Sequence, residues 1–331
     1  MKKQNKIVLF ATFLLSASLL AGCGGDETEK TQIGILQFGS FTALENVKKG
    51  FVKTLEGSKL ADQISFNIQN PQANSTTNTQ MAATLAAESD LVLGIATPSA
   101  TALKSAVDSV GTGIPVLFAA VTNPIGANLV NDLVLPGENV TGVTDLGPIA
   151  EGLQLVLDFG GVDQVTSLFT ATETNSVYQV GIAEAFLSSK GVSSSRTTIT
   201  NAGEITSAIA SIPEEVDAVF IPTDDTIANS ISLVRGAVES LDASRSKPLI
   251  VFGADSGLVE GTTFSMGIDY EASGVQVAKQ ALKILQDGAQ AGSLSVESCD
   301  NHTISINKTF AEKEGLDLPE SLLSKEGATI L

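Results

Sequence analysis

The sequence lacks most of the residues from which enzymes and metal sites are built. Its 331 residues include one His, two Cys and no Trp. A zinc ribbon, a histidine-rich metal site and a disulfide framework each need more of these residues than the chain contains. Positive charge is also scarce, because 19 Lys and Arg stand against 37 Asp and Glu and give a formal net charge of -18. This balance argues against nucleic-acid binding, which requires clustered positive charge.

Common catalytic motifs are missing as well. The sequence contains no G-x-S-x-G, G-x-x-x-x-G-K-[ST], G-x-G-x-x-G or H-E-x-x-H. Cys299 and His302 lie close in sequence, but no third residue nearby completes a catalytic set. Asp224 and Asp225 stand at a predicted helix start, where adjacent side chains point in different directions, so they are poor evidence for acid-base catalysis. We therefore expect no catalytic residues, no metal and no cofactor.

The amino-terminal segment predicts export and lipidation. Three Lys within the first six residues precede an apolar run at 7–20, and Leu20-Ala21-Gly22-Cys23 follows at once. Small residues before a Cys form the lipobox of bacterial lipoproteins, in which the Cys thiol is acylated after cleavage. The apolar run is shorter than the roughly 20 residues that a membrane span needs. We therefore predict a signal peptide at 1–22, lipid (palmitate) at Cys23, a tether at 23–31, and anchorage on the extracytoplasmic face of the cell membrane.

The mature sequence has two similar halves of alternating strands and helices. Short runs rich in Val, Ile, Leu and Phe alternate with amphipathic stretches, which is typical of parallel strands buried between helices. The first series of strand-like runs lies at 33–38, 64–69, 91–96 and 116–120. A second series lies at 165–171, 197–200, 218–221 and 249–252. A repeat of this length indicates two doubly wound lobes.

We predict an α/β fold in which two doubly wound parallel-sheet lobes are joined by a three-segment hinge. A strand at 263–268, a helix at 272–286 and a last strand at 303–306 have to be shared between the lobes. The predicted lobes are 32–144 with 256–289, and 145–255 with 290–331. Glycines at 142–147, 253–257 and 288–293 mark the segments expected to bend. Two sequential domains with no returning segment remain the alternative.

Open parallel sheets bind ligands at the carboxyl ends of their strands, where loops from both sides converge. The first-half loops at 37–42, 97–101 and 121–124 offer hydroxyls and helix-start N–H groups, which suit a carboxylate. The second-half loops carry Asp224, Asp225 and Asp255, which suit an ammonium. Together the two walls fit an α-amino acid zwitterion.

Helix capping is the competing role for these polar residues. Ser99, Asn175 and Asp224 each stand where an N-cap is wanted. Asp255 lies between two glycines and precedes no strong helix start, so it is our first choice as partner of a ligand ammonium, with Asp224 second. Phe38, Phe41 and Tyr178 could supply an apolar face to the ligand, although a core position explains each of them equally well.

The loop motifs, taken in order, resemble a known family. The motifs are IGILQF (33–38), GIATPSA (94–100), AVTNPIG (120–126), ENVTGVTD (138–145), PTDDT (222–226) and FGADSG (252–257). As a set they resemble the ABC-transporter substrate-binding lipoproteins associated with tryptophan and tyrosine uptake, and the likeness covers nearly all of 32–318.

This resemblance implies a type I periplasmic-binding fold that closes on a small ligand, and a monomer that delivers this ligand to an ABC permease with a cytoplasmic ATPase. The expected ligand is amino-acid-like. The loops and the resemblance together give the expected ligand-binding set. From the first lobe it contains Gln37, Phe38, Thr97, Ser99, Ala120 and Thr122, and from the second lobe Asn175, Ser176, Asp224 and Asp255.

Two stretches depart from the family's pattern. The sequence SFTALE at 40–45 stands where many relatives carry Glu-His-Pro-Ala-Leu-Asp, so it stays open whether the ligand is aromatic. Thr223-Asp224-Asp225 replaces the more usual Thr-Asp-Asn and adds an acid to the cleft. Because one fold serves many functions, an exported ligand sensor and an enzyme acting on a surface polymer remain alternatives.

Overall fold

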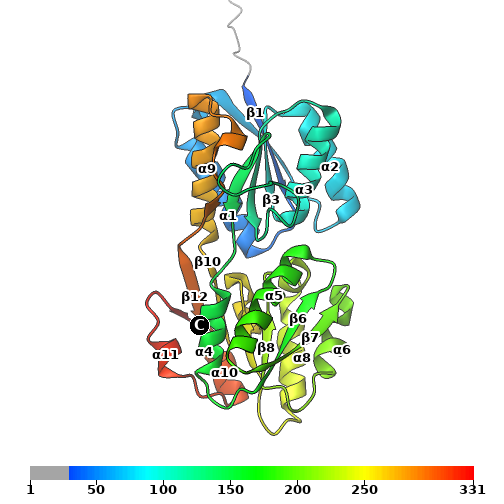
Figure 1. Cartoon of the computed structure of the whole chain (residues 1–331), viewed down its shortest axis with the longest axis vertical. Coiled ribbons are helices and arrows are strands. Elements are labelled where there is room, and N and C mark those ends of the chain that lie inside the picture. The colour runs from blue at the N-terminus through cyan, green and yellow to red at the C-terminus, as the bar shows by residue number, and fades with distance from the viewer. Residues whose placement is uncertain (1–29) are drawn as a thin grey trace, which may run out of the picture.

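The computed structural model describes residues 30–331, which form two lobes stacked along the long axis of the molecule (Figure 1). The predictions for residues 1–22 and for Cys23 lie outside the described residues, as does most of the predicted tether. Thr31, predicted to end the tether, is already the first residue of β1 (Thr31–Gln37). Within residues 30–331, no helix combines the length and the apolarity that crossing a bilayer demands.

The first lobe is built on a six-stranded sheet in which every neighbouring pair is parallel. Across the sheet its strands are β11 (Glu297–Ser298), β5 (Val140–Thr144), β4 (Val116–Val121), β3 (Leu91–Ile95), β1 and β2 (Ile64–Gln69). Four helices cover it: α1 (Thr42–Glu56), α2 (Ser75–Glu88), α3 (Thr97–Val110) and α9 (Tyr270–Asp287). Ile33 and Ile35 of β1 pack with α1 and α9 on one face, and Leu36 packs with α2 and α3 on the other.

The second lobe repeats this design with seven strands. Across the sheet they are β13 (Thr329–Ile330), β12 (His302–Ile306), β10 (Phe264–Ile268), β9 (Ile250–Gly253), β8 (Ala218–Ile221), β6 (Gln164–Thr170) and β7 (Ser193–Ile199). β12 runs antiparallel to β10. The helices are α4 (Ile149–Leu157), α5 (Thr174–Ser189), α6 (Ile205–Ala210), α7 (Asp225–Ala228), α8 (Ile231–Asp242), α10 (Lys308–Glu314) and α11 (Glu320–Leu323). Short 3-10 helices lie in both lobes: η1 (Ala61–Gln63) and η4 (Ala291–Ser293) in the first, and η2 (Ala202–Glu204) and η3 (Ser256–Gly261) in the second.

Packing in the second lobe follows from aromatic side chains on adjacent strands. Phe220, Phe252 and Phe264 point to the face covered by α4 and α5, and the Phe252 and Phe264 rings stack with centroids 5.0 Å apart. A Cβ atom on Gly152 of α4 would come within 2.0 Å of the Phe252 ring. Glycine at this position therefore lets α4 rest directly on the aromatic layer.

The chain crosses between the lobes three times, which confirms the predicted number of connections. The first crossing leads from β5 to α4 through residues 145–148, and the second from β10 to α9 through Asp269. The third leads from β11 to β12 through residues 299–301. The last two crossings lie side by side, because the backbone N–H of Asp269 donates to the carbonyl oxygen of Asn301 at 2.7 Å.

Strand pairing corrects the predicted boundaries. β10, which we assigned to the first lobe with 256–289, pairs with β9 and β12 in the second sheet. Conversely β11, assigned to the second lobe with 290–331, pairs with β5 in the first. Of the predicted bending segments only 142–147 overlaps a crossing. Residues 253–257 join β9 to η3 within the second lobe, and 288–293 join α9 to the segment before β11 within the first.

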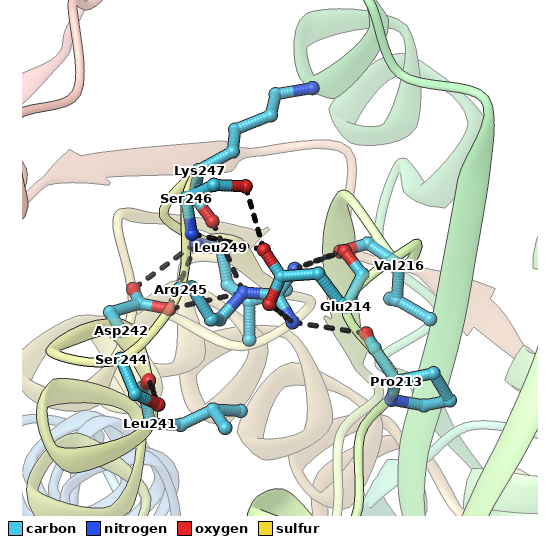
Figure 2. A network of polar contacts seen from close by, with 10 residues as sticks. All are labelled: Pro213, Glu214, Val216, Leu241, Asp242, Ser244, Arg245, Ser246, Lys247 and Leu249. Carbon is cyan, nitrogen blue, oxygen red and sulfur yellow. Dashed lines mark hydrogen bonds and ion pairs between the residues drawn. The ribbon is translucent and has the colours of Figure 1, made fainter.

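A buried arginine fixes the end of the second lobe that faces away from the first (Figure 2). The Arg245 guanidinium, whose side chain is 2% exposed, donates to the carbonyl oxygens of Pro213, Glu214 and Lys247 at 3.0–3.1 Å. Asp242 lies 3.6 Å from Arg245 Nε and offsets its charge. These loops precede β8 and β9, so they lie at the amino ends of the strands. Because the donors are used within the lobe, we interpret the cluster as structural.

Candidate functional site

A cavity of about 410 Å³ lies between the lobes, where the parallel strands of both sheets end. Its volume falls in the range of small-molecule sites, roughly 300–1,000 Å³. The first lobe lines it with residues 40–44 together with Ala96, Thr97 and Ala120. The second lobe lines it mainly with Asn175, residues 223–225 and residues 255–257. Asp145 on the first crossing and Tyr270 at the start of α9 complete the lining.

Tyr270 links two buried carboxylates in this lining. Its hydroxyl donates to Asp255 Oδ2 at 2.7 Å and lies 3.4 Å from Asp145 Oδ2. Burial raises the pKa of Asp255, while hydrogen bonds from Tyr270 and Gly257 act in the opposite direction. Burial also raises the pKa of Asp145 to about 6. A single hydroxyl proton cannot satisfy both carboxylates, so this trio is suited to receive a further positively charged donor such as an ammonium.

Asp224 is satisfied by its own lobe. Its Oδ2 atom accepts the Thr170 backbone N–H at 2.7 Å and the Ser176 hydroxyl at 2.9 Å. Its Oδ1 atom accepts the Thr170 hydroxyl at 2.9 Å and, as N-cap of α7, the Ile227 backbone N–H at 3.0 Å. The carboxylate thus ties β6, α5 and α7 together beside the cavity. Capping, the competing role that the sequence left open, is what this geometry gives Asp224.

Asp225, the next residue, has the opposite character. Asp225 lines the cavity and is half-buried, and its carboxylate has no hydrogen-bond or ion-pair partner among the described residues. Burial and the nearby carboxylates, Glu173 first among them, raise the pKa of Asp225 well above its usual range. Glu173 itself accepts the backbone N–H groups of Asp225 and Thr226 at 2.8 and 3.0 Å, and burial raises its pKa to about 7. The second-lobe wall therefore holds an unpaired acid in addition to Asp255.

The first-lobe wall is uncharged, and its backbone is strained at two points. Ala96 has a φ of 79° and Ala120 a φ of 54°, which lie in the region that non-glycine residues rarely adopt. Such conformations cost on the order of 1–3 kcal/mol and cluster at functional sites. Ala96 precedes α3, whose first backbone N–H groups have no partner inside the helix. The turn thus brings the amino end of α3, at Thr97, to the cavity, where it suits a carboxylate.

Half of the predicted ligand-binding residues reach this lining and half do not. The five that line the cavity are Thr97, Ala120, Asn175, Asp224 and Asp255. The five that do not line it are Gln37, Phe38, Ser99, Thr122 and Ser176.

Each of these five has another partner. The Ser99 hydroxyl donates to Asn78 Oδ1 at 2.9 Å, and Gln37 Nε2 donates to Glu45 Oε1 at 2.6 Å. Phe38 packs in the core of the first lobe. Thr122 and Ser176 lie behind the lining, where their hydroxyls donate hydrogen bonds to the lining residues Asp145 and Asp224. They support cavity residues rather than facing the cavity.

Among the lining residues outside the expected set are Phe41, Asp145, Asp225 and Tyr270. Phe41 and Asp145 lie within segments that the loop pattern and the resemblance had marked. Asp225 was among the loop acids that suit an ammonium, but it was left out of the expected set in favour of Asp224 and Asp255. Tyr270 carried no local signal beyond its place after Asp269, which N-caps α9 by accepting the Ala272 N–H at 3.0 Å.

The charged residues that line the cavity are all acidic. No Lys, Arg or His contributes to it among the described residues, while Asp145, Asp224, Asp225, Asp255 and Glu260 do. Within the same part of the chain no three His, Cys, Asp or Glu side chains are grouped so that they could hold a metal ion. The cavity is therefore suited to an organic ligand that carries positive charge, with any ligand carboxylate directed to the first lobe.

Comparison with known proteins agrees with this geometry. The sequence model of the family described as ABC transporter substrate binding protein matches residues 32–330. A tyrosine-binding protein of Clostridioides difficile (strain R20291) is 31% identical over 93% of this chain and 92% of its own length. A solved ABC domain in complex with L-Trp from Streptococcus pneumonia is 32% identical, covers 90% of this chain and 100% of its own, and superposes with a TM-score of 0.81.

A second solved relative is a ligand-free, open substrate binding protein with adhesive properties from Clostridium difficile. It is 30% identical over 91% of this chain and 99% of its own, with a TM-score of 0.70. A periplasmic ribose ABC transporter protein of Conexibacter woesei, at 14% identity and a TM-score of 0.58, shares the fold alone. The two sheets and these neighbours establish the predicted type I periplasmic-binding fold.

Proposed function

Because the chain belongs to the family of ABC transporter substrate binding proteins, we propose that it captures an amino acid between its lobes and delivers it to an ABC permease. The observation that carries this proposal is the division of the cavity between Asp255 with Tyr270 on one side and the amino end of α3 on the other. The first group suits an ammonium and the second a carboxylate, the two groups that every free amino acid carries.

The two relatives support an amino acid as the ligand. One is named for tyrosine binding and the other was solved with L-Trp. The chain also superposes better on the L-Trp complex than on the ligand-free, open relative, with TM-scores of 0.81 and 0.70. This difference supports a closed arrangement of the lobes, in which the cavity has the shape that it takes around a ligand.

We propose further that acylation of Cys23 holds the protein on the extracytoplasmic face of the membrane. β1 begins at Thr31, so only a few residues separate the predicted lipid from the first strand. A Cys23→Ala protein that is released from the membrane fraction would support this anchor. A Cys23→Ala protein retained as firmly as the wild type would contradict it.

Native mass spectrometry of the purified protein tests the main proposal. We expect a co-purified amino acid at close to one per chain, whose binding is then measured by calorimetry after removal and re-addition. Co-purification of a different compound class, with no response to any free amino acid, would contradict amino-acid capture. Chemical conversion of the bound compound would favour an enzyme on the same fold.

A further inference from the structure

We propose, building on the function above, that the ligand carries a second positive group and that Asp225 binds it, so that the site selects a basic amino acid over a neutral aromatic one. The geometry that points to this ligand is a carboxylate that faces the cavity and has no partner of its own among the described residues. The neighbouring Asp224, in contrast, accepts four hydrogen bonds from its own lobe.

The acids around Asp225 favour a ligand with a second positive group over a neutral zwitterion. An amino acid with an uncharged side chain brings one ammonium and one carboxylate. Its ammonium is matched by Asp255 and Tyr270, and its carboxylate by the uncharged wall of the first lobe. Asp225 would then keep its proton and add no ionic contact to such a ligand, because an unpaired carboxylate in a closed cleft is unfavourable.

The surrounding residues do not supply Asp225 with a positive charge. The charged groups that act on it, after burial itself, are all acids: Glu173, Asp224, Asp145 and Asp255. No basic side chain of the described residues lines the cavity. Glu173 cannot help, because its two oxygens are occupied by the backbone N–H groups of Asp225 and Thr226 and by the Thr226 hydroxyl. In the empty protein a proton can neutralise Asp225, as the raised pKa of this carboxyl indicates, and a cation of the ligand can displace that proton and pair with the carboxylate.

A cationic side chain also has apolar surface to pass along. Phe41 and Leu44 from the first lobe and Ile231 and Val259 from the second line the same cavity. Lysine- and arginine-type side chains combine a methylene stem with a charged end, so the stem can pack on these residues while the end reaches the acid. Two kinds of ligand have this chemistry, a basic amino acid and a diamine. Only the amino acid carries a carboxylate that the amino end of α3 can bind.

Calorimetry on the mature, detergent-solubilised protein freed of bound ligand tests the inference with L-lysine, L-arginine, L-ornithine, cadaverine, L-tyrosine and L-tryptophan. We expect at least one basic amino acid to bind ten times or more tightly than either aromatic one. Asp225→Asn should weaken that basic amino acid by 30-fold or more, as the loss of a buried ionic partner does, and leave L-tyrosine unchanged or improved. Glu215→Gln, which removes an exposed carboxylate outside the cavity lining, is the matched control and should change each affinity less than threefold.

The outcomes separate this inference from the function on which it rests. Binding of L-tyrosine or L-tryptophan with no binding of basic amino acids overturns the role of Asp225 and leaves amino-acid capture intact. Equal affinities of the wild type and Asp225→Asn for the basic ligand also overturn it, because an amide then serves as well as a carboxylate. Binding of cadaverine alone supports the second cation and contradicts amino-acid capture. Absence of binding to all six compounds overturns the role of Asp225, whereas amino-acid capture is contradicted only when no free amino acid binds.

Discussion

Gln179 reaches across the cleft: its Nε2 atom donates a hydrogen bond to Thr122 Oγ1 at 3.2 Å. Gln179 belongs to α5 of the second lobe, and Thr122 follows β4 of the first. The Thr122 hydroxyl in turn donates to Asp145 Oδ1 at 2.8 Å, on the first crossing. One hydroxyl group therefore connects both lobes with the hinge, and the bond to Gln179 exists only while the lobes are close together.

Removal of that hydroxyl should weaken ligand binding by favouring the open form. Thr122→Val keeps the shape of the side chain but leaves Gln179 Nε2 and Asp145 Oδ1 without this partner when the cleft closes. Unsatisfied buried polar groups cost about 1–3 kcal/mol each, so we expect a tenfold or larger loss of affinity in calorimetry. Thr122→Ser, which keeps the hydroxyl, should bind like the wild type. Equal affinities of the Val and Ser variants would show that the link does not contribute to closure.

Cys299 should report the hinge motion. It is the free Cys of the described chain, it is buried in the third crossing, and its Sγ atom donates to the Asp269 carbonyl oxygen at 3.5 Å on the second. Rotation about these crossings should loosen this contact, so alkylation of Cys299, followed by peptide mass spectrometry, should be slower with ligand than without. The denatured protein gives the limiting rate. Identical rates in the loaded and empty protein would place the bending elsewhere.

The sequence predicted the fold correctly, but it did not predict which of the two sheets contains β10 and β11. A strand followed by a helix reads the same in either lobe, and β10 with α9 was therefore assigned to one lobe as a unit. The structure divides the unit at Asp269. Pairing of β10 with both β9 and β12 places it in the second sheet, and these partners lie far apart in sequence. Local periodicity carries no information about such long-range pairing.

The site shows the same limit at the level of side chains. Parallel topology placed the right loops at the cleft, which is why Thr97, Asn175 and Asp255 line the cavity. It could not show which way each side chain turns. Ser99 turns inward because α2 places Asn78 beside it, and Tyr270 reaches the cleft because α9 returns to the first lobe. Both depend on contacts between distant segments.

Ser99→Ala should lower stability without changing affinity. The Ser99 side chain is fully buried, and its loss leaves Asn78 Oδ1 without its donor at a cost of about 1–3 kcal/mol. Thermal unfolding should shift down by several degrees, while calorimetric affinity stays within twofold. Ser105→Ala, on the exposed side of the same helix, is the control and should change neither. A large loss of affinity in Ser99→Ala would return this residue to the ligand site.

The empty protein should lose part of its stability as pH rises from about 4 to 7. Burial raises the pKa of Asp145 from 3.8 to about 6, so the folded state holds a proton that the unfolded chain releases. Deprotonation of Asp145 in the fold then costs roughly 3 kcal/mol above pH 6. Carboxylates with lowered pKa values, such as Glu184 beside Arg196, act in the opposite direction. Asp145→Asn isolates the effect: its melting temperature should gain on the wild type from pH 4 to 7, and a constant gap would refute the assignment.

Asp255→Asn should separate ligand binding from stability. The ammonium of an amino acid leaves water when the cleft closes, and a buried cation without a carboxylate is costly, so affinity should fall by two or more orders of magnitude. The substitution preserves local structure, because the amide oxygen can still accept the Gly257 N–H and the Tyr270 hydroxyl can accept from the new amide. Tyr270→Phe, which removes one neutral hydrogen bond, is the comparison and should lose less. If Asp255→Asn instead lowers the melting temperature of the empty protein and leaves calorimetric affinity unchanged, Asp255 serves η3 rather than the ligand.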